Sequence, residues 1–343
     1  MGNVDHQSQV LIIAELSANH GGSLERAIQT VKAAADAGAD AIKIQTYTAD
    51  TLTIDAPQPW FQVQAGSLWE GRTLYDLYQE AHTPWEWHAE LKAETERAGL
   101  LFFSTPFDAT AVDFLEQLDV PMHKIASFEL VDHALLAKVA ATGKPVIMST
   151  GMATLEEIEE AVDVLRKNGC RELTLLKCTS AYPAPYHEMH LRTIPDMAQR
   201  FQVPVGLSDH TLGSEVAIAA VALGAGIIEK HFTLSRSDGG PDAAFSMETH
   251  EFKQMVSAIR NVEKSLGHVC YEVSEKEAAS RVFRRSLFVV EDIKSGEVFT
   301  GHNVRSIRPG HGLPPKHLVE ILGQRAARDV ERGTPMTWDL VIR

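Results

Sequence analysis

Long apolar segments and paired cysteines are both missing from this sequence of 343 residues. No run of about 18 apolar residues occurs that could cross a membrane, and the opening MGNVDHQSQV lacks the basic and apolar regions of a secretory leader. The sequence has three cysteines, Cys170, Cys178 and Cys270. This number is odd and their spacing is not that of a metal site, which argues against a disulfide framework. We therefore expect a cytoplasmic protein in a reducing compartment.

Positive charge is also scarce in this chain. The sequence has 32 Lys and Arg residues against 46 Asp and Glu residues, for a formal net charge of -14. Non-specific binding to nucleic acid and binding to anionic membranes both need a basic surface, so this charge argues against both. An anionic substrate must then be held by a few local positive groups.

Short β-branched runs alternate with amphipathic segments along most of the chain. The amphipathic segments open on capping residues and close on glycine, as in Ser23 to Gly38. There are eight strand-like runs, at residues 10–17, 40–47, 100–107, 121–127, 145–151, 173–180, 203–209 and 226–232. Mostly apolar strands that alternate with helices predict a parallel (β/α)8 TIM barrel, with an open doubly wound sheet as the alternative.

Two segments depart from this alternation. Residues 48–83 are too long and too aromatic for a simple connection, and long insertions after a strand often lie over active sites. Near the C-terminus the pattern changes to short strands with Gly and Pro turns. We therefore expect a catalytic barrel domain over 1–267, a linker over 268–280 and a small β-rich domain over 281–343.

Polar residues gather where the predicted strands end, which is where barrel enzymes build their sites. Such a ring is too polar to be the filling of a core, so we interpret it as the lining of a substrate-binding site. Its members include Glu15, Lys43, Gln45, Thr105, Lys124, Ser127, Ser149, Ser180, Tyr182, Ser208 and Glu229.

Lys43 and Lys124 leave three interpretations open. Each could be a buried lysine paired with Glu15 or Glu229. Together, and surrounded by hydroxyl groups, they could bind a small phosphorylated or carboxylated ligand. Alternatively, one of them could attack a carbonyl as the Schiff-base lysine of an aldolase, because a desolvated amine titrates low.

His210 and His231 end two successive predicted strands, in the stretches GLSDHTLG and IIEKHF. Their rings can reach one point, and two imidazoles with open positions for substrate or water are typical of a catalytic divalent metal site. With no thiolate beside them, we expect Mn²⁺ or a related ion rather than structural zinc. His20 could be a further ligand or could simply pack.

Two loop residues are weaker candidates. A Gly-Gly-Pro turn precedes Asp242 and could bring it to the barrel mouth, although it could equally be a solvated loop residue. Arg308, in IRPGHGLPP, lies at a Pro-Gly turn of the small domain. An arginine on a rigid turn suits recognition of a carboxylate or phosphate, although a single surface arginine usually has no such role.

These stretches together resemble the sialic acid synthase family. The resemblance covers nearly the whole chain, through IIAELSANHGG, FFSTPFD, KIASFE, STGMATLEEI, LKCTSAYPAP, GLSDHTLG, IEKHFTL and IRPGHGL. The motifs AELSANH and GSLW are similar to those of the pseudaminic acid synthase branch, and the C-terminal segment resembles an antifreeze-like (SAF) domain. A TIM barrel followed by a small β-clip SAF domain is the fold that this resemblance implies.

The resemblance also implies a reaction, the condensation of phosphoenolpyruvate with an amino-sugar aldehyde and release of phosphate. In the pseudaminic acid branch the sugar would be 2,4-diacetamido-2,4,6-trideoxy-L-altrose, and synthesis of N-acetylneuraminate or legionaminate is the alternative. Ser180 stands where neuraminate synthases often have asparagine, in the motif CTSAYP, and this bears on the choice of sugar.

Residue roles follow from the same resemblance. His210 and His231 would hold the divalent metal, with Mg²⁺ or Co²⁺ as alternatives to Mn²⁺. Glu15 would be a general base or would stabilise positive charge, and Tyr182 and Asp242 would face the sugar or a metal-bound water. The phosphate and carboxylate of phosphoenolpyruvate would be bound by Lys43, Thr105, Lys124, Ser127, Ser149 and Ser208.

Arg308 matches a family arginine that reaches from the SAF domain into the barrel of a partner subunit. The resemblance therefore implies a domain-swapped homodimer, with Arg308 among the catalytic residues together with Glu15, His231 and Asp242.

Overall fold

The computed structural model describes residues 9–63 and 69–342. Most of the GSLW motif, up to residue 68, lies outside the described residues, together with residues 1–8 and 343. The chain divides into two compact units, Met1–Gly267 and His268–Arg343, and each has an apolar core of its own.

The first unit is a closed barrel of eight parallel strands. Each strand pairs with the next in the chain, and β1 also pairs with β8, which closes the sheet. The predicted TIM barrel is therefore confirmed, and an open doubly wound sheet is excluded. The strands are β1 (Leu11–Glu15), β2 (Ala41–Thr46), β3 (Leu101–Pro106), β4 (His123–Ile125), β5 (Val146–Ser149), β6 (Leu173–Cys178), β7 (Val205–Asp209) and β8 (Ile227–Thr233).

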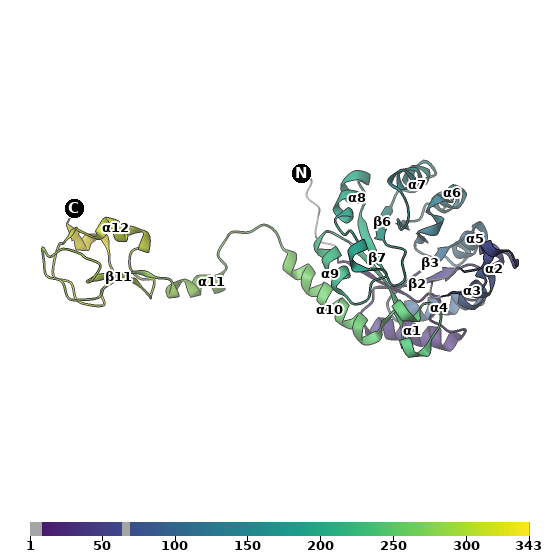
Figure 1. The fold of residues 1–343 in the computed structure, drawn as a ribbon, viewed down its shortest axis with the longest axis horizontal. Helices are drawn as coiled ribbons and strands as arrows, with labels where there is room; N and C mark the ends of the chain where they lie inside the picture. Colours follow the sequence, from purple (N-terminus) through teal and green to yellow (C-terminus); the bar gives the residue numbers. More distant parts are fainter. Residues whose placement is uncertain (1–8, 64–68, 343) are drawn as a thin grey trace. The chain divides into compact units, whose positions relative to one another are not determined.

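Helices are arranged around these strands (Figure 1). The helices that follow the strands are α1 (Leu24–Asp36), α4 (His88–Arg97), α5 (Ala109–Gln117), α6 (His133–Ala141), α7 (Leu155–Lys167), α8 (Thr193–Phe201), α9 (Glu215–Ala222) and α10 (Thr249–Leu266). Helix α7 begins with a capping box, in which Thr154 and Glu157 each bond the other's backbone N–H. Such caps stabilise a helix by about 1 kcal/mol. Within the described residues, no helix is long and apolar enough to span a membrane.

Two apolar clusters hold the barrel unit together. The larger one fills the space between strands and helices, with residues such as Leu115, Leu165 and Met255 fully buried. The smaller one lies inside the barrel and includes Ile13, Ala41, Phe103, Ile147, Leu176 and Ile227. Because side chains of a strand alternate between its two faces, the interior positions two residues further along are 15, 43, 105, 149, 178 and 229. The barrel interior therefore changes from apolar to polar toward the C-terminal ends of its strands.

The described part of the insertion after β2 includes the α-helices α2 (Ala49–Leu52) and α3 (Leu74–Ala81). Tyr47, at the end of β2, packs edge-on against Tyr78 of α3 and against Phe107 after β3, with ring centroids 5.9 and 5.1 Å apart. These contacts anchor the insertion to the C-terminal end of the barrel. A two-residue strand, β9 (Met247–Glu248), pairs with the end of β8.

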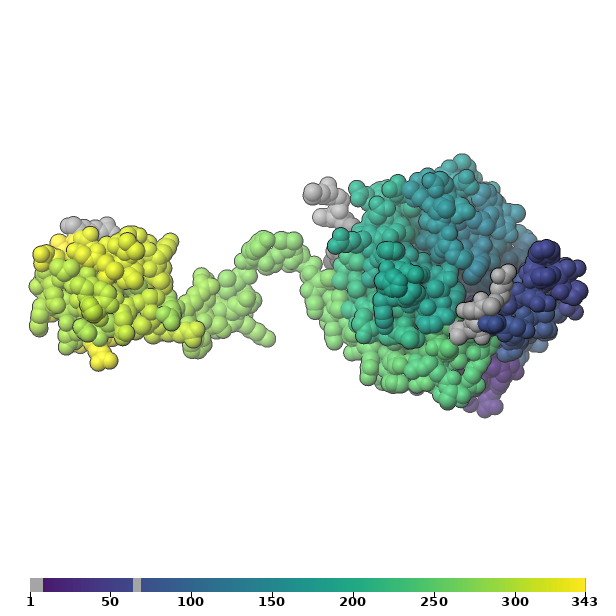
Figure 2. All heavy atoms as spheres, viewed as in Figure 1, coloured from purple at the N-terminus to yellow at the C-terminus, as the bar shows by residue number. Residues whose placement is uncertain are grey.

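The second unit is small and built mainly from short antiparallel pairs. Strand β10 (Ser286–Val289) pairs with β11 (Val304–Ile307), and β12 (Arg325–Ala326) pairs with β13 (Val341–Ile342). Its helices are α11 (Glu275–Ser280) and α12 (Leu318–Ile321). The fully buried residues Leu287, Phe299 and Met336 belong to its core. Figure 2 shows the atoms that follow α11 packed into a compact body of their own.

Candidate active site

The register of the barrel strands brings charged residues from distant parts of the chain together. Glu15 of β1 lies opposite Lys43 on one side and opposite His231 on the other. Ser208 of β7 lies opposite Glu229 of β8. These are the interior positions above the apolar cluster, so the polar residues gather at the end of the barrel where barrel enzymes bind their substrates.

Two lysines and two glutamates form a buried cluster at this end. Lys43 contacts Glu15 directly, and its Nζ lies 3.7 Å from Oε2 of Glu229. Lys124 Nζ lies 3.8 Å from the other oxygen of Glu229. All four residues are at most 4% exposed. Removing such ions from water costs on the order of several kcal/mol each, which apolar residues in the same space would not cost. A buried cluster of this kind is therefore weak evidence for a stabilising role and is typical of a functional site.

Burial changes the ionisation of this cluster. Desolvation raises the pKa of Glu15 to about 7, although Lys43 opposes the shift. Desolvation also lowers the pKa of Lys124, whereas the nearby carboxylates raise the pKa of Lys43 despite its burial. Glu15 can therefore gain or lose a proton close to neutral pH, which a general base requires.

Hydroxyl groups line the same space. Lys124 Nζ donates to Ser149 Oγ at 2.7 Å, and Lys43 Nζ donates to Thr105 Oγ1 at 3.2 Å. Ser208 Oγ donates to Glu229 at 2.9 Å. Several hydroxyl donors beside two ammonium groups can bind an anion with two acidic groups.

Gly151, just after β5, allows two further hydroxyl groups to approach the backbone. Its N–H donates to Ser127 Oγ at 3.1 Å. A Cβ atom at this position would lie 2.2 Å from Ser180 Oγ and 2.7 Å from Ser127 Oγ. Glycine is therefore required here for both serines to keep their places.

His210 and His231 lie side by side at the ends of β7 and β8, with ring centroids 5.3 Å apart. The Nδ1 atom of His210 lies 3.0 Å from the carbonyl oxygen of Thr179, which can only accept, so Nδ1 carries a proton and Nε2 is left to bind a ligand. Burial holds the pKa of His231 well below its usual range, so its ring is neutral.

These two imidazoles fit a divalent metal. His231 Nδ1 is buried and lacks a hydrogen-bond partner among the described residues, and Asp242 Oδ2 lies 4.0 Å from it. Asp242 in turn accepts hydrogen bonds from Ser17 and from the N–H of Ala18. Within the described part of the chain, no group of three or more His, Cys, Asp or Glu side chains is arranged to hold a metal. The donor set is thus two imidazoles, and substrate or water would complete the coordination.

A buried ion pair ties together the strands that carry the histidines. Lys230 Nζ lies 2.7 Å from Asp209 Oδ2 and 2.6 Å from the carbonyl of Thr211, and the two charged residues are each 1% exposed. They are opposite each other in the register of β7 and β8. Each directly precedes one of the two histidines in the chain, so the pair fixes the strand ends from which both imidazoles project.

Residues 30–271 match the NeuB family, and residues 284–342 match the SAF domain. The chain belongs to the NeuB family. Its resemblance to sialic acid synthases is thereby confirmed, and so is the barrel with a C-terminal SAF domain.

Named relatives of this NeuB-family chain are pseudaminic acid synthases. The chain is 46% identical to that of Campylobacter jejuni over 97% of both proteins. It is 44% identical to that of Helicobacter pylori, over 97% of this chain and 98% of the relative. Among solved structures, the N-acetylneuraminic acid synthetase of Leptospira borgpetersenii, crystallised with citrate, has a TM-score of 0.71 at 34% identity, over 80% of this chain and 90% of that chain.

Most of the residues selected from the sequence of this NeuB-family protein lie around one space. Glu15, Lys43, Thr105, Lys124, Ser149 and Ser208 surround the charge cluster, and Ser127 and Ser180 meet over Gly151. Gln45 follows Lys43 on β2, partly exposed. Tyr182 packs against His210, with ring centroids 4.4 Å apart, and Asp242 lies beside His231.

Two candidates lie elsewhere. His20 packs edge-on against Trp87, and its Nδ1 accepts a hydrogen bond from the N–H of Gly22, which agrees with the packing interpretation rather than with metal binding. Arg308 lies in the second unit, exposed at the turn that follows β11.

The sequence left some residues of this site unselected. Glu229 was predicted among the polar strand ends and as a partner of one lysine, but its position between both lysines was not predicted. Glu129, in the turn after β4, has a carboxyl group whose pKa burial raises to about 7, although nearby Lys124 opposes the shift. The close contacts of Gly151 and the position of Trp69 were also missed, because both depend on loops that are distant in the chain.

A cavity of the barrel unit lies away from the candidate site. A cavity of about 390 Å³ is lined by residues at the N-terminal ends of the strands, among them Leu11, Met122, Val146, Leu173 and Ile227. The buried ionisable groups lie at the other end of the barrel, at the C-terminal ends of the strands.

Proposed function

We propose that this protein is a pseudaminic acid synthase. It condenses phosphoenolpyruvate with 2,4-diacetamido-2,4,6-trideoxy-L-altrose to give a nine-carbon nonulosonic acid and phosphate. The observation that supports the proposal is that two buried lysines lie beside two adjacent histidines. The chain that holds them is 46% identical to a pseudaminic acid synthase over nearly its full length.

In this proposal the two lysines hold the anionic donor. Lys43 and Lys124 neutralise the phosphate and carboxylate of phosphoenolpyruvate, and the surrounding hydroxyls donate to its oxygens. The hydroxyl donors are Thr105, Ser127, Ser149 and Ser208. A donor held at so many points presents its C3 atom in one orientation, which removes much of the entropic barrier to reaction with a second substrate.

The reaction forms one carbon–carbon bond and breaks one carbon–oxygen bond. The C2–C3 π electrons of phosphoenolpyruvate form the new bond to the aldehyde carbon, whose oxygen becomes a hydroxyl group. Water then adds at C2 and loses a proton, and the C2–O bond to phosphate breaks as the C2 carbonyl forms. A divalent metal, with Mn²⁺ first and Mg²⁺ or Co²⁺ as alternatives, supplies a Lewis acid for the aldehyde oxygen when bound by His210 and His231.

Glu15 is the group suited to the water step. Its pKa of about 7 makes it a base near neutral pH, and its carboxylate also stabilises the positive charge that develops at C2. Asp242 and Tyr182, beside the two histidines, face the amino sugar, and Gln45 and Ser180 complete the substrate contacts.

We further propose that the protein acts in the cytoplasm as a domain-swapped homodimer. In such a dimer, Arg308 of one subunit binds the substrate held in the barrel of the other. Its exposed position on a turn of the second unit leaves the guanidinium free for this role.

The test is phosphate release from phosphoenolpyruvate after chelation and addition of Mn²⁺. The trideoxy-altrose sugar, N-acetylmannosamine and the precursor of legionaminate are offered in parallel. Metal-dependent release with the altrose sugar alone supports the proposal. Release with another sugar would make the protein a neuraminate or legionaminate synthase, and release with none would refute the synthase proposal.

Two lysine variants, one at the charge cluster and one away from it, add a control to this test. Lys124→Met should abolish phosphate release. Lys177→Met should leave phosphate release close to wild type. Lys177 is the second-last residue of β6, and its ammonium group donates to the carbonyl of Cys178 and to the hydroxyl of Thr179, not to the charge cluster.

A Schiff-base aldolase is the second candidate function. The observation in its favour is that burial lowers the pKa of Lys124, which leaves more of the amine unprotonated and able to attack a carbonyl. Borohydride trapping of a pyruvate or sugar adduct on Lys124 or Lys43 would support the aldolase. A protein that releases phosphate but forms no trapped adduct is a synthase.

A further inference from the structure

The C-terminal end of the barrel has two chemically different sides. One side is the charge cluster of Lys43, Lys124, Glu15 and Glu229. The other side is a set of aromatic rings that adjoin both histidines, which we call the aromatic wall and define as Trp69, Tyr182 and Phe245.

Contacts within the aromatic wall are close. The Tyr182 ring lies 4.4 Å from His210 and 5.0 Å from Phe245, measured between centroids, and Phe245 lies 4.9 Å from His231. Trp69 extends the wall outward, with its ring 5.9 Å from that of Tyr182. Phe245 is 2% exposed and Trp69 is half-buried, so the wall runs from the buried histidines toward solvent.

Trp69 also connects two loops that are distant in the chain. Its indole N–H donates to the carbonyl oxygen of Pro241 at 2.9 Å. Pro241 directly precedes Asp242, which is bonded to Ser17 and Ala18 after β1. The insertion after β2 is thereby joined to the loop that carries Asp242.

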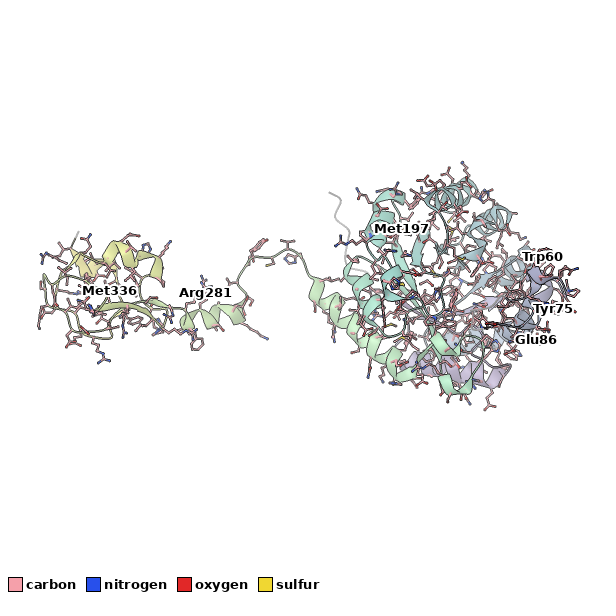
Figure 3. All side chains as sticks on the ribbon, viewed as in Figure 1. Trp60, Tyr75, Glu86, Met197, Arg281 and Met336 are labelled. Atoms are coloured by element: carbon pink, nitrogen blue, oxygen red, sulfur yellow. The ribbon has the colours of Figure 1, made fainter. Side chains whose placement is uncertain are left out.

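Another tryptophan of the same insertion lies differently. Trp60 is 78% exposed and lies at the outer edge of the barrel unit, where Figure 3 shows it close to Tyr75 of the same insertion. An aromatic residue in this insertion therefore does not face the barrel mouth by default, and the position of Trp69 is specific.

We propose that Trp69 is a specificity-determining residue for the amino sugar, and this inference rests on the proposed function. The proposed sugar carries a 6-methyl group and two acetamido methyl groups, which an aromatic face accommodates well. N-acetylmannosamine has a hydroxyl group at C6 and only one acetamido group. An apolar pocket distinguishes a single methylene by about 10- to 200-fold, so the wall is able to set the choice of sugar.

The division of the site also separates the two substrates. The anionic donor is held by the lysines, and the acceptor lies against the aromatic wall. A change at Trp69 should therefore alter the kinetics with the sugar and leave those with phosphoenolpyruvate unchanged.

The experiment compares wild type, Trp69→Ala, Trp69→Leu and the matched control Trp60→Ala. Phosphate release is measured with varied phosphoenolpyruvate, varied trideoxy-altrose sugar and varied N-acetylmannosamine, and thermal unfolding reports the folding of each variant. For Trp69→Ala we expect the KM for the trideoxy sugar to rise about tenfold or more, with the KM for phosphoenolpyruvate within about twofold of wild type. The ratio of kcat/KM between the two sugars should fall, and Trp60→Ala should match wild type.

If Trp69→Ala does not fold, Trp69→Leu is measured in its place. Leucine keeps apolar volume at this position but has neither the aromatic face nor the N–H donor. An unchanged KM for the trideoxy sugar and an unchanged ratio in the folded variants would overturn the role of Trp69. Wild-type protein that releases no phosphate with any sugar would instead overturn the proposed function and this inference with it. The wild-type assay therefore separates the two failures.

Discussion

At the scale of single residues, the ionisation of Glu15 is controlled by burial. The pKa of this carboxyl is raised from its ordinary value of 4.5 to about 7, so between these values the folded protein binds a proton that the unfolded chain has released. The stabilisation from this group is thus complete below pH 4.5 and is lost as the pH rises through about 7.

We therefore predict that Glu15→Gln makes stability less dependent on pH. Between pH 4.5 and 8, wild type should lose more of its free energy of unfolding than the variant, by on the order of 3 kcal/mol. Urea denaturation of both proteins without substrate, at several pH values, measures the difference. Parallel curves for the two proteins would show that Glu15 does not titrate in this range.

At Gly151, the addition of one carbon should disturb hydroxyl groups at the proposed donor site. Gly151→Ala should raise the KM for phosphoenolpyruvate by about tenfold or more, because the new Cβ would displace the hydroxyl groups of Ser127 and Ser180. Gly226→Ala is a matched control directly before β8, where the nearest neighbour of a Cβ would be the carbonyl oxygen of Val205, 3.8 Å away. Equal KM values for the two variants would exclude a role for the glycine in donor binding.

At the scale of elements, the position of the histidines depends on how β7 and β8 are held together. We predict that Lys230→Met weakens Mn²⁺ binding by about tenfold or more, since groups behind metal ligands commonly contribute 10- to 100-fold to affinity. It should also lower stability, because Asp209 is left as an unpaired buried charge. The double variant Asp209→Asn/Lys230→Met should recover stability but not affinity.

The control for this prediction is another ion pair of the barrel unit. Asp40 lies 2.6 Å from Arg260 and bonds the N–H of Ile12, near the N-terminal ends of β1 and β2. Asp40→Asn should lower the melting temperature and leave Mn²⁺ affinity unchanged. If calorimetric titration showed the same loss of affinity in both variants, the effect of Lys230 would be one of general stability.

At the scale of the whole molecule, the proposed domain-swapped dimer makes a prediction that a single subunit could not satisfy. Arg308→Ala and Lys124→Met should each be inactive alone, with metal binding intact in Arg308→Ala. When the two are expressed together, about half of the dimers are mixed and one of their two sites is complete, so activity should recover to about a quarter of wild type. Arg305→Ala, on the adjacent β11, should remain active throughout. Absence of recovery would exclude a shared site.

Much of this architecture could be predicted from patterns that are local in the chain. Each strand of the barrel lies within the residues predicted for it or within one residue of them, because buried parallel strands are short apolar runs with recognisable ends. The polar residues at those ends were also recognisable, since parallel strands bring their C-terminal ends to one edge.

Contacts between distant segments could not be predicted in the same way. No local pattern indicates that Glu229 lies between both lysines, that Trp69 reaches Pro241, or that two serines meet over Gly151. Each depends on the register between strands or on the path of a loop. The raised pKa of Glu15 likewise depends on how completely the rest of the barrel excludes water from it.

The sequence by itself determined the alternation of strands and helices, the residue types at the strand ends and the adjacency of the two histidines. These follow from side-chain periodicity and from the order of the strands. Only the tertiary structure decided which charges pair, which carboxyl holds a proton near neutral pH and which aromatic ring reaches the mouth. The reason is physical, because pairing and desolvation depend on distances between groups that the chain brings together only when the barrel closes.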